Sequence, residues 1–555
     1  MSAPPSTLHP AQIDLLAAGA ILGLPAAWLG GRDLDLLSPL RLLAPGALPD
    51  GPPPAVERSE IARGLRAANA SYGHPRAAEL AAKLADPATR VVIGGQQTGL
   101  FGGPQLALIK AAAAARHAEA LEAAGVPAVA LFWMASEDHD WDEVASATLP
   151  AGEELLLLSL GEDRAPLVPV GLRTVGPEIT TLFESVASRF PSPWFAAWSE
   201  KLAGWWRPGA RFGEAFARQF VATLGGRAPL FVDSMLPELK RAERPHLRRL
   251  VERRDEVDAA YAAAEAAIIA GGYSLQVEAR RGASPLFALR DGLRRRIEWV
   301  DSERFRLRGG PRGAGDPEPI ALLLEMIDDN PAAISPGVLA RPAIQDAVFG
   351  TTLQIMGPAE TAYLAQARAI YPLLDVTPPL TALRPQALVL DLRQRQQIAD
   401  LGGSIAELYL HPEAIEHRLA ERGGAGFVGE RRGEIERLAD ALKEPALRLD
   451  SSLEKPWQKT RDTLLGALDA FAAKVESAAA RRDEVTHQRF RQLKTAVRPG
   501  GKPQERAISS AFFPGRYGEN FGGALLDQLE LDPRLLSLID PAAGGAGETR
   551  GDAGQ

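Results

Sequence analysis

The segment from Val91 to Ala135 constrains the fold most strongly. It begins with "VVIGG", whose β-branched residues predict a buried strand, and it continues into a glycine-rich loop. Leu106 to Gly125 has helical composition with a glycine at its end, and "VPAVALFWMA" reads as a second apolar strand. A strand, a loop, a helix and a strand within about 45 residues predict a βαβ unit. Because the strands of such a unit are parallel, the segment indicates an α/β protein with a doubly wound sheet.

Further apolar segments extend this α/β core. The candidate strands are "EELLLLSL", "APLFVDSM", "GTTLQIMG" and the pair "SPLFALRDG" and "RRRIEWV", with helical stretches between them. Residues 1–54 are rich in proline and glycine, which predicts an irregular N-terminal segment. We expect residues 55–425 to form the catalytic core, a parallel sheet with an inserted β-rich region.

The C-terminal third has a different character. Between residues 426 and 498 charged residues dominate, and Leu464, Leu468, Phe471 and Val475 fall on one stripe of a helix. Two prolines interrupt this pattern, so we expect an α-helical coiled-coil hairpin rather than one rod. Periodicity alone leaves open whether the hairpin projects and binds a partner or lies on the core. Residues 499–540 are expected to return to the core, and the low-complexity residues 541–555 to be disordered.

Composition excludes several classes of protein. The chain has 555 residues, of which 46% are hydrophobic, and a net charge of -8, which is typical of a soluble globular protein. This modest acidity argues against nucleic acid as the main partner. The absence of cysteine excludes disulfides, thiolate zinc sites and a cysteine nucleophile. Without a signal-peptide pattern or a run of 18 apolar residues, we expect a cytoplasmic protein with no membrane partner.

The loop after the first predicted strand has the composition of a ligand-binding loop. Ligands of open α/β sheets bind beyond the carboxyl ends of the strands, where glycines allow close approach and helix N-termini attract anions. The glycines that can take positive φ here are Gly94, Gly95, Gly99, Gly102 and Gly103, and neutral hydrogen-bonding groups come from Gln96, Gln97 and Thr98. The loop suits a carboxylate, a phosphate or a sugar hydroxyl, or else its glycines only satisfy turn geometry. It is neither a Walker motif nor a dinucleotide fingerprint.

The second predicted strand ends in "SEDHDWDEV", an acidic turn around one histidine. Five carboxylates at the ligand-binding end of a strand are costly unless they hold a positive group or move protons. The turn could bind a substrate ammonium and supply a general base, with His139 as the proton carrier. It could also hold Mg²⁺ through its oxygens, or it could be a solvated turn. A lone histidine argues against a zinc site.

Taken together, these two motifs resemble a known family. "GGQQTGLFGGP", followed one helix later by "FWMASEDHDWDEV", is similar to BshC, the cysteine-adding enzyme family of bacillithiol biosynthesis. The stretches "SPGVLARPAIQD", "GPAETAYLAQ" and "QERAISSAFFPGRYG" extend the resemblance over about Ala55 to Leu529. The resemblance implies a Rossmann-like core akin to nucleotidylyltransferases and class I aminoacyl-tRNA synthetases, and a coiled-coil domain that forms a homodimer. It also implies a ligase that joins the carboxyl of cysteine to the amine of glucosaminyl-malate, giving bacillithiol.

The chain departs from the pattern of adenylate-forming synthetases. No H-x-G-H motif follows the first predicted strand, and no K-M-S-K-S-like stretch occurs. Where a comparable loop would fall, "TALRPQALVL" carries only Arg384. ATP and Mg²⁺ are candidate cofactors, but the usual motifs for ATP are absent.

Amide formation needs a neutral attacking amine, so a base must take a proton from the substrate ammonium. We assign this step to the acidic turn, with Asp138 and His139 as leading candidates, Asp140 orienting the imidazole and Glu137 as a further catalytic candidate. Arg341 could pair with a substrate carboxylate in bidentate fashion, or it could form a structural salt bridge. The substrate-binding candidates are Gly95, Gln96, Gln97, Thr98, Gly99, Gly102, Arg341 and Glu360. Tyr363 and Gln366 lie near the same helix face as Glu360. Gln345 and Asp346 are lesser candidates.

Two other classes of function remain open. A nucleotidyltransferase or adenylate-forming enzyme with another small substrate would use the same core and loop, and ATP would then raise its thermal stability. A non-catalytic scaffold would instead use the hairpin, with the core as its support. In that case no small molecule would stabilise the fold.

Overall fold

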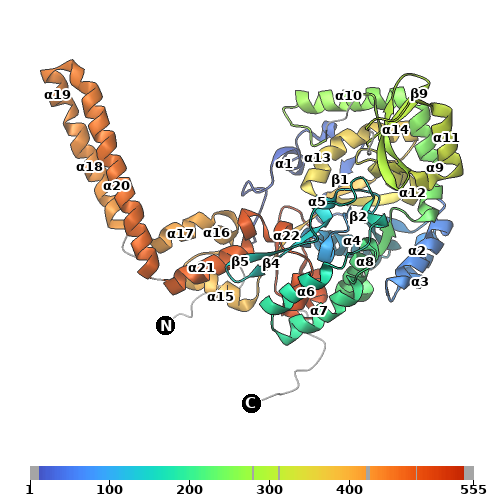
Figure 1. The fold of residues 1–555 in the computed structure, drawn as a ribbon, viewed down its shortest axis with the longest axis horizontal. Coiled ribbons are helices and arrows are strands. Elements are labelled where there is room, and N and C mark those ends of the chain that lie inside the picture. Colours follow the sequence, from blue (N-terminus) through green and yellow to red (C-terminus); the bar gives the residue numbers. More distant parts are fainter. Residues whose placement is uncertain (1–11, 278–280, 310–312, 421–425, 483, 543–555) are drawn as a thin grey trace, which may run out of the picture. The chain divides into compact units, whose positions relative to one another are not determined.

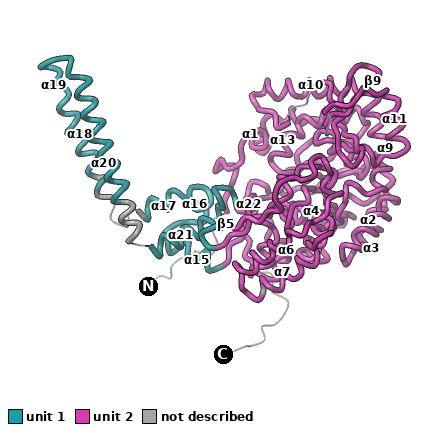
Figure 2. Tube along the Cα trace, in the orientation of Figure 1, with its two compact units in different colours: residues 1–10, 152–155, 392–503 teal, residues 11–151, 156–391, 504–555 magenta. Residues whose placement is uncertain are grey.

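The computed structural model describes residues 12–277, 281–309, 313–420, 426–482 and 484–542. The chain divides into two compact units, which Figure 2 shows in different colours. The larger, which we call the core unit, comprises residues 11–151, 156–391 and 504–555, and the smaller, the helical unit, comprises residues 1–10, 152–155 and 392–503. The sequence prediction ended the core at residue 425, because helices α15 (Leu392–Asp400), α16 (Ile405–Leu410) and α17 (Pro412–Ala420) do not differ in composition from core helices.

The core unit is built on a six-stranded sheet in which all neighbouring strands are parallel. The strand order is β1 (Arg41–Leu42), β13 (Leu380–Leu383), β12 (Thr351–Met356), β2 (Arg90–Gln96), β3 (Ala128–Met134) and β6 (Leu230–Asp233). The chain runs outward from β2 through β3 to β6, and in the opposite direction from β12 to β13. The strand order therefore reverses between β2 and β12. Such a reversal is called a switch point, and open α/β sheets bind ligands there. The predicted doubly wound parallel sheet is confirmed.

The N-terminal segment is less irregular than the sequence suggests. It contains helix α1 (Gly23–Leu29), and β1 pairs with β13 at the edge of the sheet. A strand of two residues is too short to show an alternating pattern, so the sequence gives no sign of it.

Two hydrophobic cores fill the opposite faces of the sheet. Val92 and Phe132 pack toward helices α4 (Gln105–Ala123) and α8 (Phe212–Leu224). Their neighbours Val91 and Leu131 pack toward α2 (Ser59–Ser71), α3 (Ala77–Ala85), α9 (Pro237–Glu252) and α12 (Arg341–Phe349). Since successive residues of a strand point to opposite faces, filling both cores requires continuous apolar runs. The runs "VVI" and "VALFWM" meet this requirement.

The inserted β-rich region lies between β6 and β12 in the sequence and forms an antiparallel sheet. Its order is β10 (Glu318–Pro319), β9 (Arg304–Arg308), β8 (Leu293–Trp299), β7 (Ala283–Arg290) and β11 (Ile334–Pro336). The predicted pairing of "SPLFALRDG" with "RRRIEWV" is the β7–β8 hairpin. From β11 the chain leads directly into α12, so this sheet adjoins the start of a helix of the core.

Residues 504–539 form part of the core unit. Strand β15 (Leu536–Ile539) pairs with β14 (Gln386–Val389), and helix α22 (Gln504–Ala507) carries Glu505. Both carboxylate oxygens of Glu505 accept hydrogen bonds from the buried Arg384, at 2.6 and 2.9 Å. This pair attaches the C-terminal segment to the end of β13. Of the predicted disordered tail, residues 543–555 lie outside the described residues.

Within the helical unit, α18 (Gly426–Ala441) and α20 (Glu454–Arg482) lie side by side as a hairpin, joined through α19 (Lys443–Leu449) (Figure 1). Arg432 pairs with Asp469 across the hairpin at 2.7 Å. The predicted hairpin is confirmed, and Leu468 and Val475 of the predicted apolar stripe are half-buried, but its other two members are exposed. Leu465 is the buried residue of α20 here, whereas Leu464 is 48% and Phe471 is 52% exposed.

The remaining described elements complete both units. They are α5 (Trp141–Val144), α6 (Ile179–Arg189), α7 (Pro193–Trp205), α10 (Arg254–Ala270), α11 (Ile320–Asp329), α13 (Pro358–Ala367), α14 (Tyr371–Leu374), α21 (Glu484–Val497), α23 (Phe512–Tyr517), α24 (Phe521–Gln528), β4 (Ser146–Ala151) and β5 (Glu154–Ser159). Among the helices of the described chain, we find none with the length and apolar character needed to span a bilayer.

Candidate active site

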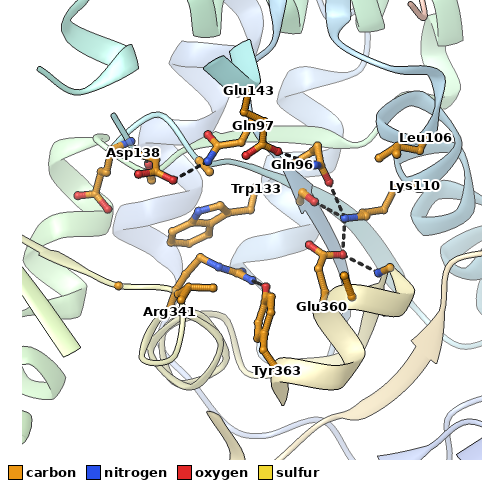
Figure 3. A pocket seen from close by; sticks show the side chains of 18 of the residues that line it. Gln96, Gln97, Leu106, Lys110, Trp133, Asp138, Glu143, Arg341, Glu360 and Tyr363 are labelled. Carbon is orange, nitrogen blue, oxygen red and sulfur yellow. Dashed lines mark hydrogen bonds and ion pairs between the residues drawn. The ribbon is translucent and has the colours of Figure 1, made fainter. Parts of the chain in front are cut away.

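A cavity of about 390 Å³ opens at the carboxyl ends of β2, β3 and β12, at the switch point of the sheet. Its walls are the end of β2, the acidic turn after β3, the loop between β11 and α12, and the start of α13. Figure 3 shows side chains from these elements directed toward it. Its charged lining residues are Glu137, Asp138, Glu143, Glu360, Lys110, Arg294, Arg341, Arg384 and Arg506. Acidic and basic groups thus share one cavity.

A buried lysine connects the two sides of the switch point. Lys110 lies on α4 and is 1% exposed. Its Nζ donates hydrogen bonds to Gly95 O at 2.6 Å, to Gln96 Oε1 at 2.8 Å and to Glu360 Oε2 at 2.5 Å (Figure 3). Burial lowers the pKa of Lys110, while the Glu360 carboxylate opposes this effect. The lysine therefore fixes Gln96 at the end of β2 and Glu360 in the first turn of α13.

Glu360 also caps its own helix. The backbone N–H of Gly357 donates to Glu360 Oε2 at 2.5 Å. Burial acts against the Glu360 charge, but Lys110, the Gly357 N–H and Arg341 together hold the pKa of this carboxyl below its ordinary value. Because Lys110 and the Gly357 N–H both donate hydrogen bonds to the Glu360 carboxylate, Glu360 is a fixed part of the cavity wall.

On the opposite side, Asp138 is held by residues from two sheets. Gln97 Nε2 donates to Asp138 Oδ2 at 2.6 Å, and Arg294 Nη1 donates to Oδ1 at 3.1 Å. Arg294 belongs to β8 of the inserted sheet, is 7% exposed, and packs over the Phe287 ring at 3.9 Å. The inserted region therefore supplies the cation that neutralises the first aspartate of the acidic turn.

His139 and Asp140 lie outside the residues that line the cavity. His139 Nδ1 is 3.6 Å from Asp138 Oδ1 and 3.4 Å from Arg294 Nη1. Burial and then Arg294 lower the pKa of His139, so the imidazole is neutral at pH 7. Asp140 does not orient the imidazole as expected. It caps α5 instead, where Oδ1 accepts from the backbone N–H of Glu143 at 3.2 Å, a position that favours aspartate.

Glu137 points mainly away from the cavity, into a buried ion cluster. Its Oε1 lies 2.6 Å from Lys240 Nζ, which also lies 2.6 Å from Glu243 Oε2. Burial raises the pKa of Glu137, while Lys240 acts in the opposite direction. Only the edge of Glu137 reaches the cavity, so its main contacts anchor the acidic turn to α9.

Glu143 is the functional candidate that sequence reasoning missed. It stands on α5 at the exposed rim of the cavity, with its carboxyl group toward Gln96, whose Nε2 donates to Oε1 at 3.5 Å (Figure 3). The protein around the carboxyl, followed by Asp140 and Asp138, raises the pKa of Glu143 to about 7. The sequence shows Glu143 as one acid of five, and only the short helix α5 turns it toward the cavity.

The glycine loop differs from its prediction in backbone conformation. Gly94 and Gly95 belong to β2, and Gly99 has a φ of -68°. Of the five glycines, only Gly102, with φ +80°, and Gly103, with φ +63°, take the left-handed conformation. Gly94 and Gly95 therefore continue the strand, where the absence of a side chain admits Lys110 of α4 beside Gly94 and Trp133 of β3 beside Gly95.

Only the first part of the predicted loop reaches the cavity, where Gly95, Gln96 and Gln97 line it. Thr98, Gly99 and Gly102 lie outside its lining. A side chain at Gly102 would overlap Ser510 Oγ, and the first N–H of α4 donates to Ile508 O at 2.8 Å. The second half of the loop and the N-terminus of α4 thus face residues 508–510 rather than a ligand.

Arg341 is a cavity cation with neutral partners. Its guanidinium donates to Gln345 Oε1 at 2.8 Å and to Tyr363 OH at 3.3 Å, and Figure 3 shows it directed toward Tyr363 below Trp133. Within the described chain Arg341 forms no ion pair, so the structural salt bridge considered as its alternative role is not present.

Two lesser candidates on these helices are structural. Asp346 is buried and accepts hydrogen bonds from Gln354 Nε2 and from Tyr371 OH. Gln366 donates to Val277 O at 2.6 Å and lies outside the cavity lining.

The acidic turn does not have the geometry of a magnesium site. Among the described residues, no three His, Asp or Glu side chains are grouped so that they could hold a metal ion. Glu137 points to Lys240, and Asp138 points to Arg294. Because Mg²⁺ requires converging oxygen ligands, the residues present do not fit it here.

Comparisons with known proteins identify the family. The model described as "Bacillithiol biosynthesis BshC, N-terminal Rossmann-like domain" matches residues 51–385. The model described as "Bacillithiol biosynthesis BshC, C-terminal coiled-coil domain" matches residues 387–532. The chain belongs to the BshC family. The resemblance carried by the glycine-glutamine and acidic motifs is thereby confirmed.

Full-length relatives agree with this assignment. A BshC protein of Salinibacter ruber is 29% identical over 454 residues, covering 80% of this chain and 81% of the relative. A relative from Heliobacterium modesticaldum is 28% identical over 473 residues, covering 82% and 83%. One from Geobacillus kaustophilus is 28% identical over 475 residues, covering 80% and 83%. Each of the three relatives is described as "Putative cysteine ligase BshC".

Proposed function

We propose that this BshC protein is a cysteine ligase that joins the carboxyl of L-cysteine to the amine of glucosaminyl-malate through an amide bond, giving bacillithiol. Glucosaminyl-malate carries an ammonium group on its sugar and carboxylates on its malyl part. The observation that carries the proposal is the cavity at the switch point, where an acidic side with Asp138 and Glu143 faces a basic side with Arg341. These charges complement both ends of the substrate.

On the basic side, Arg341 holds the malyl carboxylate. Because Gln345 and Tyr363 are its hydrogen-bond partners, a carboxylate can bind the guanidinium in bidentate fashion without displacing an ion pair. Arg506 stands at the same cavity and forms no ion pair in the described part of the chain. A second carboxylate, or the carboxyl end of cysteine, would bind there.

On the acidic side, Asp138 and Gln97 orient the ammonium. Arg294 donates to one oxygen of Asp138, and Gln97 donates to the other. His139 stands behind Asp138 as a neutral group, and Glu137 anchors the turn. In this proposal the amine lies above the ends of β2 and β3.

The carboxyl of cysteine must be activated before an amine can displace a leaving group from it. A nucleoside triphosphate would supply this activation when bound. Arg506, which lines the cavity, would face its phosphates.

The hairpin of the helical unit is proposed to form a homodimer. Leu438, Leu442, Leu464 and Phe471 are 68%, 65%, 48% and 52% exposed on α18, α20 and their connection. Apolar side chains exposed in this way along paired helices are typical of a surface that a second copy covers.

Thiol analysis of cells that lack the protein tests the proposed reaction. We expect glucosaminyl-malate to accumulate and bacillithiol to disappear, and a plasmid copy of the wild-type protein to restore the thiol. Unchanged thiols in the deleted strain would overturn the proposal.

A further inference from the structure

The carboxylates that line the cavity differ in the groups that neutralise them. Three of the four form ion pairs with buried or nearly buried cations: Glu137 with Lys240, Asp138 with Arg294, and Glu360 with Lys110. Glu143 is the fourth, and within the described chain it has no cationic partner. An unpaired carboxylate in a substrate cavity is available for a positive group of the substrate.

Lys110 determines which end of the Gln96 amide faces Glu143. Lys110 Nζ donates to Gln96 Oε1 at 2.8 Å, so the amide oxygen of Gln96 must face the lysine and its NH₂ group must face the other way. That NH₂ group meets Glu143 Oε1 at 3.5 Å. The second oxygen, Oε2, has no hydrogen-bond partner in the described chain and is free for a ligand in the cavity.

The charged and titratable groups around Glu143 come from three elements. Asp138 and Asp140 belong to its own turn, Glu360 to α13, and Lys110 to α4. Burial of the carboxyl and the three neighbouring carboxylates all raise its pKa, to about 7, and Lys110 opposes them. A general base works best when its pKa lies near the working pH.

We propose that Glu143 is the general base of the ligase reaction and accepts the proton that the substrate ammonium must lose. The inference rests on the proposed function. The Glu143 carboxylate takes one proton through Oε2, and the nitrogen keeps its electron pair and becomes the neutral nucleophile that attacks the activated carboxyl. The exposed rim then lets Glu143 return the proton to water.

The other candidates in the turn are less suited to this step. Both oxygens of Asp138 already accept hydrogen bonds from Gln97 and Arg294, so neither is free for the amine proton. His139 lies behind Asp138 and outside the cavity lining. Asp140 is engaged in capping α5.

The kinetic test compares Glu143→Gln with Asp142→Asn, which removes the same charge from an exposed position on the same helix. At pH 7, Glu143→Gln should lower kcat by about 10²–10⁴-fold, while Asp142→Asn stays near wild type. The wild-type rate should rise with pH through about 7, where Glu143 ionises. In Glu143→Gln the rate should instead rise at a higher pH, where the substrate ammonium loses its proton without a base. Equal pH profiles for wild type and Glu143→Gln would overturn the proposal.

A binding experiment tests the same contact without turnover. Calorimetry of glucosaminyl-malate binding at pH 6, in buffers of different ionisation enthalpy, measures the protons released. Most Glu143 is protonated at pH 6, so pairing with the ammonium should release about one proton in wild type and in Asp142→Asn, and none in Glu143→Gln. At pH 8.5, where Glu143 is already ionised, the release should vanish in wild type as well.

The outcomes separate the two proposals. Proton release that persists in Glu143→Gln would overturn the role of Glu143, even if the protein is a ligase. Glu143-dependent release without amide formation would contradict the ligase function and support the ammonium contact. A wild-type protein that does not bind glucosaminyl-malate would contradict both.

Discussion

At the scale of single residues, Lys110 should matter for both stability and activity. Replacing it with methionine leaves Glu360 without its cation and frees the Gln96 amide. We expect the free energy of unfolding to fall by about 3–5 kcal/mol, as for other broken buried ion pairs, and ligase activity to fall at least tenfold. Denaturant unfolding and kcat/KM measure the two effects.

A surface lysine provides the control. Lys83 pairs with Glu122 at the surface, so Lys83→Met should change the free energy of unfolding by less than about 1 kcal/mol and leave activity unchanged. A Lys110→Met protein with wild-type activity would show that the Lys110 network does not position the site.

Gln97 and Gly99 lie two residues apart, yet their substitutions should act differently. Gln97→Ala removes the donor to Asp138, so it should weaken binding of glucosaminyl-malate by about 1–3 kcal/mol and leave stability unchanged. A side chain at Gly99 would meet Gly103 Cα at 2.9 Å, so Gly99→Val should lower the melting temperature. Calorimetric binding and thermal melting separate these effects. Loss of binding in a fully stable Gly99→Val protein would instead place Gly99 in the site.

The sequence could place the acidic turn but not its partners. The apolar run of β3 ends at Met134, and this fixes the turn at the carboxyl end of a strand. Arg294 reaches Asp138 from 156 positions further along the chain, and Lys110 lies within the apolar first half of α4. Neither contact leaves a local pattern that a sequence could show. The orientation of Glu143 depends on the capping of α5 by Asp140, which is equally hidden.

At the scale of elements, α22 should depend on one buried ion pair. Arg384 is 2% and Glu505 is 1% exposed. Arg384→Ala would leave Glu505 buried and unpaired, and we expect a loss of about 3–5 kcal/mol in the free energy of unfolding, measured with denaturant. The double variant Arg384→Met/Glu505→Leu should recover much of this loss, because no charge stays buried. A single variant as stable as wild type would show that the pair does not hold α22.

Element prediction succeeded where periodicity was long enough. The βαβ unit from β2 to β3, the β7–β8 hairpin and β12 all have apolar runs with clear turns between them. The second half of the glycine loop was assigned to a ligand because glycines serve turns, close packing and ligands alike. Only the contacts of Gly102 with Ser510 and Gln219, from distant parts of the chain, reveal that packing is its purpose.

At the scale of the whole molecule, the hairpin should determine the oligomeric state. Leu464→Glu combined with Phe471→Glu places charges on its exposed apolar surface without touching the buried Leu465. We expect sedimentation to show dimers for the wild-type protein and monomers for the double variant, with unchanged helix content. Dimers in the double variant would place the interface elsewhere. The exposure of these two residues could not be predicted from spacing. Helical periodicity identifies an apolar stripe, but it does not show which side of the stripe packs against the other helix of the hairpin.

A crystal structure of the protein with glucosaminyl-malate tests the central claim most directly. We predict that the ligand occupies the cavity between β2 and β12, with its amine nitrogen within about 3 Å of the Glu143 carboxylate and a malyl carboxylate on Arg341. A ligand bound outside this cavity, or bound with its amine facing Arg341 and its carboxylates facing the acidic turn, would contradict the account.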